Sequence, residues 1–175
     1  MNLHKKIIIG GAQLGMKYGV ANKHGEISAN HLERILNFAI KKKIYTIDTA
    51  TSYNRSLKKI SKTIKNKKFQ KKIKLIIKVN KISSLNNVEI HKHLSGNNVS
   101  CIMAHSTELF LKKSFQKKII NLKKKFNFQV GVSIYENDEL YKLKKFFDFI
   151  NIIQVPYNII NFKVFDKRIL KLLRQ

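Results

Sequence analysis

The sequence of 175 residues contains one cysteine and one proline, and its opening segment has no long apolar run. Since Cys101 is the only thiol, disulfides within the chain are excluded and a reducing cytoplasm is expected. The run Ile7–Ile9 is too short for a signal peptide or a membrane span, so we expect a soluble protein. No linker or low-complexity segment divides the chain, and we therefore expect one domain over residues 1–175.

Acidic residues are also scarce, because 10 Asp and Glu stand against 36 Lys and Arg, which gives a formal net charge of +26. A basic surface gains affinity for nucleic acids by releasing counterions from phosphates. However, 32 of the basic residues are lysines and only 4 are arginines, whereas bidentate contacts with phosphate and guanine favour the guanidinium group. The lysines are spread along the whole chain, which favours a solvated surface with loose binding to polyanions. A basic nucleic-acid-associated protein remains an alternative.

Apolar runs of strand length alternate with helical patterns, which is typical of βα units around a parallel sheet. The strands are predicted near residues 7–10, 44–48, 73–79, 99–104, 128–133 and 149–154. Apolar stripes at helical spacing predict helices over Asn30–Lys42 and Glu108–Phe126. Further helices are expected after Tyr53, after Ser83, after Glu136 and at the C-terminus. Since a (β/α)8 barrel has eight strands, the predicted fold class is α/β, a TIM-barrel type with about six βα units.

Polar residues lie at or near the ends of three predicted strands, at Asp48, Lys78 and His105, and Tyr53 follows Asp48 by five residues. In a (β/α) barrel the carboxyl ends of the strands carry the loops in which chemistry occurs, so these four residues are candidates for one site. Each has an ordinary alternative: a helix cap for Asp48, a core tyrosine, a solvated lysine and a satisfied loop histidine. Only the agreement of the four positions favours a functional role for these residues.

Asp, Tyr, Lys and His in this order resemble the tetrad of the aldo-keto reductases, and the resemblance implies the reduction of a carbonyl group, which needs a hydride at carbon and a proton at oxygen. Tyr53 is the proposed proton donor, because a neighbouring cation makes a phenol hydroxyl a better acid. Lys78 would supply that cation, and the Asp48 carboxylate would keep the lysine charged and oriented. His105 would position the substrate by a hydrogen bond to its carbonyl oxygen.

The chain resembles the aldo-keto reductases in the order of several motifs. These are Ile7–Gly15 (IIIGGAQLG), Thr46–Ala50 (TIDTA), Ile77–Val79 (IKV), Gly131–Ser133 (GVS) and Gln154–Asn158 (QVPYN), together with the tetrad Asp48, Tyr53, Lys78 and His105. The resemblance implies an NAD(P)H-dependent oxidoreductase of aldehydes or ketones. After Tyr53 the family usually has Gly and, three residues later, Glu, where this chain has Asn54 and Leu57.

The resemblance also implies a cofactor, NADP(H) or alternatively NAD(H). Its expected binding residues are Gln13, Asp48, Ser133, Gln154 and Tyr157. Ser133 and Gln154 would bind the nicotinamide carboxamide, and Tyr157 would stack on the ring. The Gly10–Gly11 pair could let the backbone approach a ligand or could form an ordinary turn. There is no GxGxxG motif, which argues against a Rossmann site.

Compared with the family, the chain is expected to be truncated at its C-terminus and to end within the sixth helix. A homologue that binds the cofactor without catalysis is therefore another alternative, and weak activity and self-association through open sheet edges are expected. Substrate identity and oligomeric state cannot be read from these motifs.

No metal site is expected from the sequence. His91 and His93 are two residues apart, which places them on different faces of a helix, and we interpret both as surface residues. Cys101 lies in an apolar run, so a nucleophilic role is not expected.

Overall fold

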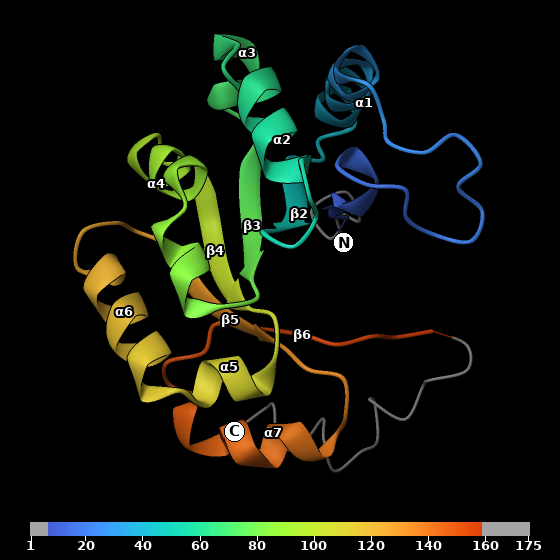
Figure 1. Cartoon of the computed structure of the whole chain (residues 1–175). Coiled ribbons are helices and arrows are strands. Elements are labelled where there is room, and N and C mark those ends of the chain that lie inside the picture. Colours follow the sequence, from blue (N-terminus) through green and yellow to red (C-terminus); the bar gives the residue numbers. More distant parts are fainter. Residues whose placement is uncertain (1–6, 159–175) are drawn as a thin grey trace.

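A computed structural model describes residues 7–158, and the predicted C-terminal helix lies outside these residues. Within them the chain forms a six-stranded sheet in the order β1-β2-β3-β4-β5-β6, with every neighbouring pair parallel. The strands are β1 (Ile9–Gly10), β2 (Thr46–Ala50), β3 (Lys74–Val79), β4 (Val99–Ala104), β5 (Gln129–Ser133) and β6 (Ile152–Gln154). Helices join successive strands and follow the outer side of the curled sheet (Figure 1).

The helices are α1 (Ala29–Lys41), α2 (Ser56–Ile64), α3 (Lys67–Gln70), α4 (Val88–Ser95), α5 (Thr107–Leu111), α6 (Lys113–Lys123) and α7 (Asp138–Leu143). Short 3-10 turns cover Ala12–Leu14, Ile82–Asn86 and Lys144–Phe146. The prediction of an incomplete barrel of βα units is therefore confirmed. No helix in the described residues is both long and apolar enough to cross a bilayer.

Several predicted boundaries need correction. The first and sixth strands are shorter than predicted, because they begin at Ile9 and Ile152. The second strand is displaced by two residues, so Asp48 lies in the middle of β2 and not at its end.

The predicted helix Glu108–Phe126 is two helices, α5 and α6, separated by an extended Lys112 with φ −67° and ψ 120°. Residues five apart on one continuous helix point about 140° away from each other. The break lets Phe110 and Phe115 both enter the core, with ring centroids 6.2 Å apart.

Alternate residues of each strand face opposite sides of the sheet, as pleating requires. Leu75, Ile77 and Val79 of β3 belong to the large core between sheet and helices, whereas Ile76 belongs to a small cluster with Cys101 and Met103. Lys78 has the same parity as Ile76 and therefore shares its face. The sheet thus has an outer face covered by helices and an inner face that carries both apolar and polar side chains.

The curl of the sheet is visible in one long-range contact. In a flat sheet, β2 and β6 would lie four strand spacings apart, about 19 Å. Instead, Gln154 of β6 donates a hydrogen bond from Nε2 to Asp48 Oδ2 of β2 at 3.0 Å. The contact spans the inside of the half-barrel and brings the sixth strand opposite the second.

Candidate active site

The centre of the site is an ion pair on the inner face of the sheet. Lys78 Nζ lies 2.8 Å from Asp48 Oδ2, and the two side chains are only 8% and 14% exposed. β2 and β3 are adjacent strands in parallel register, with Asp48 opposite Ile76 and Ala50 opposite Lys78, so the two side chains share a face and lie two residues apart along it. A charge this shielded from water needs a partner, and each ion supplies one for the other.

Gln154 completes this pair. Its Oε1 accepts a hydrogen bond from Lys78 Nζ at 3.0 Å, and its Nε2 donates to Asp48 Oδ2. Burial of the Lys78 ammonium opposes its charge, but the hydrogen bond and attraction of Asp48, with a smaller contribution from Tyr53, outweigh burial and raise the pKa of Lys78 above its usual value. The lysine is therefore a fixed cation at neutral pH.

Tyr53 lies in the loop between β2 and α2, with the Lys78 ammonium 5.6 Å from the centroid of its ring. The loop is held by backbone hydrogen bonds from Tyr53 N to Ala50 O and from Ser56 N to Tyr53 O. Asn54 has a φ of +42°, in the left-handed region where glycine is favoured and asparagine is the usual substitute. Asn54 therefore accommodates a turn that favours glycine, and Leu57 is a buried core residue.

A close approach at Gly15 fixes the other side of this loop. A Cβ atom on Gly15 would lie 2.2 Å from Tyr53 O and 2.1 Å from Ser56 N, so no larger residue fits there. The segment before α1 therefore packs directly on the backbone that carries Tyr53. Gly11 is tied to the same region, because its N–H donates to Asp48 O at 2.7 Å.

His105 follows β4 and faces Tyr53, with ring centroids 6.3 Å apart and ring planes at 86°. Its Nδ1 lies 3.5 Å from Ser52 Oγ. Burial and the positive charge of Lys78 lower the pKa of His105, and the negative charge of Asp48 offsets only part of this effect. The ring is therefore neutral near pH 7, and a neutral imidazole carries one donor and one acceptor nitrogen.

Two cavities meet at Asp48. One, of about 280 Å³, lies inside the half-barrel and is lined by apolar side chains together with Asp48 and Gln154. The other, of about 330 Å³, is lined by the backbone of Gly10–Ala12 and by Gln13, Tyr18 and Tyr53. Within residues 7–158, the buried Asp48 Oδ1 receives no hydrogen bond. Asp48, which lines both cavities, thus keeps one buried oxygen without a donor among the described residues.

The remaining predicted cofactor residues, Gln13, Ser133 and Tyr157, lie at three different places around the site. Gln13 lines the second cavity and donates to Tyr18 O at 3.0 Å. Ser133 is buried on β5 beside Gln154, its partner in the β5–β6 register. Tyr157 follows β6 and is 62% exposed. The structure therefore brings together Asp48, Tyr53, Lys78, His105 and Gln154, with Gln13 and Ser133 at the margins and Tyr157 on the surface.

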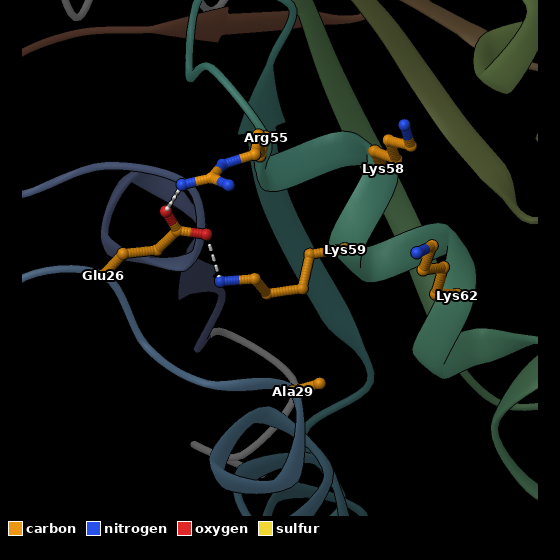
Figure 2. Close-up of a pocket in the computed structure, with 6 residues that line it drawn as sticks. All are labelled: Glu26, Ala29, Arg55, Lys58, Lys59 and Lys62. Carbon is orange, nitrogen blue, oxygen red and sulfur yellow. Dashed lines mark hydrogen bonds and ion pairs between the residues drawn. The ribbon is translucent and has the colours of Figure 1, made fainter.

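A cluster of ion pairs outside the barrel wall also supports the site, and the sequence analysis did not predict it. It consists of Glu26 with Arg55 and Lys59 and is called the clamp below. Figure 2 shows Glu26 between Arg55 and Lys59 of the α2 segment, in a cavity of about 340 Å³. Glu26 pairs with Arg55 at 3.1 Å and with Lys59, which also donates to Ile27 O. Because Ile27 N–H donates to Gln13 O, the clamp holds the loop that carries Gln13. Its partners are about 30 residues apart, so no local pattern could reveal it.

The interpretation of His93 as a surface residue is wrong. His93 is 5% exposed, and its Nε2 lies 2.7 Å from Ser61 Oγ of α2. It joins α4 to α2 because Ile90, His93 and Leu94 share the buried face of α4. His91 contacts Leu85 O through Nε2 at 2.9 Å. No group of three or more His, Cys, Asp or Glu that could hold a metal occurs in the described part of the chain.

Comparison with known proteins gives a consistent result. The family model described as Aldo/keto reductase family matches residues 6–124, a segment that includes Asp48, Tyr53, Lys78 and His105. A Pseudomonas aeruginosa protein assigned to the aldo-keto reductases has a similar structure, with a TM-score of 0.60 at 13% identity over 85% of this chain and 71% of that one. An aldo/keto reductase from Brucella melitensis gives 0.59 at 18% identity, covering 92% and 63%.

At these identities the structural likeness establishes the fold alone. No curated protein sequence matches the chain.

Proposed function

The chain belongs to the aldo/keto reductase family, and from this premise we propose that it is an oxidoreductase that reduces an aldehyde or ketone with NADPH. The observation that carries the proposal is the ion pair of Lys78 and Asp48 on the inner face of the sheet, with Tyr53 of the adjacent loop beside the Lys78 ammonium. A bound nicotinamide would supply the hydride to the carbonyl carbon. The protein would supply the proton to the carbonyl oxygen, and the products would be an alcohol and the oxidised nicotinamide.

Tyr53 is the proposed proton donor. The buried Lys78 ammonium beside its ring favours a developing phenolate, so the hydroxyl can release its proton as negative charge grows on the substrate oxygen. Asp48 holds that ammonium in place at 2.8 Å. The neutral His105 ring would donate a hydrogen bond to the same substrate oxygen and orient the carbonyl group.

The residues present fit a nicotinamide cofactor. Asp48 Oδ1 is a buried acceptor without a donor among residues 7–158, and such an atom suits a ribose hydroxyl. Gln154 and Ser133 are adjacent on the inner face, where an amide and a hydroxyl could bind a carboxamide. Gln13 and Tyr157 are the remaining cofactor residues of the proposal, and NADP(H) is preferred to NAD(H) from family resemblance alone. The single buried thiol supports a reducing, cytoplasmic setting.

The test is Tyr53→Phe, which removes the hydroxyl and keeps the ring. Consumption of NADPH would be followed with a panel of simple aldehydes, and binding of NADPH by nucleotide fluorescence. We expect turnover to fall by about 10²–10⁴ with cofactor affinity unchanged. The matched control is Tyr135→Phe, the same change at an exposed tyrosine, which should leave both quantities unaltered.

Unchanged turnover in Tyr53→Phe would exclude the role of Tyr53. Binding of NADPH without turnover of any carbonyl compound would support the alternative of a cofactor-binding homologue that does not catalyse.

We further propose that the chain self-associates. Within residues 7–158, β1 and β6 are the two ends of the sheet, and strand edges pair readily with other chains. Light scattering of the purified protein measures the self-association directly. A monodisperse monomer that binds NADPH at micromolar concentration and reduces an aldehyde would contradict this second proposal and leave the first intact.

A further inference from the structure

Gln154 occupies an unusual position for a residue on the last described strand. It lies on β6, yet its side chain contacts β2 and β3 on the opposite side of the half-barrel. One amide thus touches both members of the ion pair, with its oxygen on the Lys78 ammonium at 3.0 Å and its nitrogen on the Asp48 carboxylate at 3.0 Å. The orientation is the only one that satisfies both partners, because an ammonium can only donate and a carboxylate can only accept.

We propose that Gln154 is a positioning residue that holds the Lys78 ammonium in a fixed place between Asp48 and Tyr53. An ammonium on a four-carbon stem has three donors and considerable rotational freedom. Asp48 Oδ2 and Gln154 Oε1 take two of these donors from two different directions, and the ammonium then lies 5.6 Å from the Tyr53 ring centroid. Without Gln154 the ammonium would lose one of its two short side-chain contacts, Asp48 Oδ2 and Gln154 Oε1, and would be less firmly held against rotation.

The amide also orients the carboxylate. Asp48 Oδ2 accepts from both Lys78 and Gln154, whereas Oδ1 is buried and has no donor among the described residues. A carboxylate held through one oxygen presents the other in a defined direction. Gln154 therefore fixes the direction of the acceptor that the site leaves unused.

The same amide can link the ion pair to a ligand. An amide has two donor hydrogens and two acceptor lone pairs, and the contacts with Lys78 and Asp48 use one of each. One donor and one acceptor remain for a carboxamide group. This consequence rests on the proposed function, whereas the positioning of Lys78 does not.

The experiment measures Lys78 directly, without cofactor or substrate. Trace acetylation with acetic anhydride over a range of pH, read by mass spectrometry, gives the midpoint at which each lysine becomes reactive. The exposed Lys81 in the loop after β3 is the internal reference. In Gln154→Leu the ammonium loses a hydrogen-bond acceptor, so the Lys78 midpoint should fall and its labelling near pH 8 should rise about tenfold.

Two further variants separate positioning from a general loosening of β6. Gln154→Glu faces the ammonium with a carboxylate and should raise the Lys78 midpoint. Asn151 lies just before β6, and its Oδ1 accepts a hydrogen bond from the Val130 N–H of β5. Asn151→Ala removes this contact and leaves Gln154 unchanged, so the Lys78 midpoint should not move.

A Lys78 midpoint that does not fall in Gln154→Leu would overturn the proposal, as would an equal fall in Asn151→Ala. An unchanged or lowered midpoint in Gln154→Glu would overturn it even if Gln154→Leu failed to fold. Because labelling requires no turnover, the result does not depend on whether the chain reduces carbonyl compounds.

Discussion

The two faces of the sheet differ in how their side chains are kept from water. On the outer face, strand residues such as Leu75, Ile77 and Val132 pack against helices in one large apolar core. On the inner face, a small cluster of Ile76, Cys101 and Met103, with the partly buried Ile152, lies beside the polar group of Asp48, Lys78 and Gln154. The outer face is stabilised by burial of apolar area, and the inner face by a few specific contacts.

This difference follows from what covers each face. Helices supply apolar side chains all along the outer face, so any apolar residue of suitable volume is stabilised there. The inner face lines a cavity, and among the described residues Asp48, Lys78 and Gln154 bind one another there. Truncations on the outer face should therefore cost more stability than truncations on the inner face, where changes should also affect local geometry and chemistry.

The largest expected effect is on the outer face, at Phe110. This side chain is fully buried and contacts Phe115, Phe146 and Phe149. We expect Phe110→Ala to lower the free energy of unfolding by about 3–5 kcal/mol, because it leaves a closed cavity in a packed core. Urea denaturation followed by circular dichroism measures the change.

The matched change on the inner face is Met103→Ala. Met103 is 1% exposed but borders an existing cavity of about 280 Å³, so its removal enlarges that space and creates no new closed void. We expect a loss near the lower end of the range for such changes, about 2 kcal/mol. Equal losses for the two variants would show that the two faces are packed alike.

A medium effect is expected when a methyl group is added to the inner face. A Cβ on Gly131 would lie 2.8 Å from Met103 Cε, 3.0 Å from Ile152 O and 3.1 Å from Cys101 Sγ. Since Ile152 O is backbone of β6, Gly131→Ala should push β6 away and cost about 1–3 kcal/mol. Gly10→Ala is the control, because nothing lies within 4 Å of its Cβ, and it should change stability by less than about 0.5 kcal/mol.

A smaller effect, in pH dependence, is expected at His93 in the helix layer of the outer face. Burial and the positive charge of Lys92 lower the pKa of His93, and the negative charge of Glu89 offsets only part of this effect. Below an unperturbed pKa of about 6.5 the unfolded chain therefore binds a proton that the folded chain does not. The free energy of unfolding should fall as the pH decreases from neutrality through this value.

Denaturation at several pH values tests this expectation. His93→Gln should weaken the dependence of the unfolding free energy on pH, whereas the control His31→Gln, at an exposed position, should not. His105 also has a lowered pKa and contributes in the same direction, so some dependence should remain. A profile identical to that of the unsubstituted chain in His93→Gln would refute the assignment.

The last prediction needs no substitution and leaves stability unchanged. Burial on the inner face, with the negative charge of Asp48, raises the pKa of Cys101 to about 12. Because only the thiolate attacks a disulfide reagent, the native thiol should react at least about a thousandfold more slowly at pH 8 than an unfolded one. Rapid native reaction would mean that the inner face opens to solvent.

Much of the fold could be predicted from local pattern. Val99–Ala104 is a strand at the predicted bounds, and Ala29–Lys41 is a helix within one residue of the prediction at each end. Both segments have strong apolar periodicity, and local periodicity reports which side of an element is buried. The break at Lys112 was not predicted, since it depends on Phe110 and Phe115 filling the same core.

The candidate site could be predicted only in part. Asp48, Lys78 and His105 were identified from polar residues near strand ends, although Asp48 proved to be in mid-strand. The contacts of Gln154 were not anticipated, and neither was the clamp of Glu26 on Lys59. These contacts join positions 106, 76 and 33 residues apart, at which no short sequence pattern can report proximity.

The sequence by itself determined which segments become strands and helices, because the alternation of apolar and polar residues decides which side of each element leaves water. It also determined that the strands are parallel, since helices lie between them. Only the tertiary structure decided which polar side chains meet. The curl of the sheet brings Gln154 Nε2 within 3.0 Å of Asp48 Oδ2, whereas in a flat sheet with the same strand order the two strands would lie about 19 Å apart.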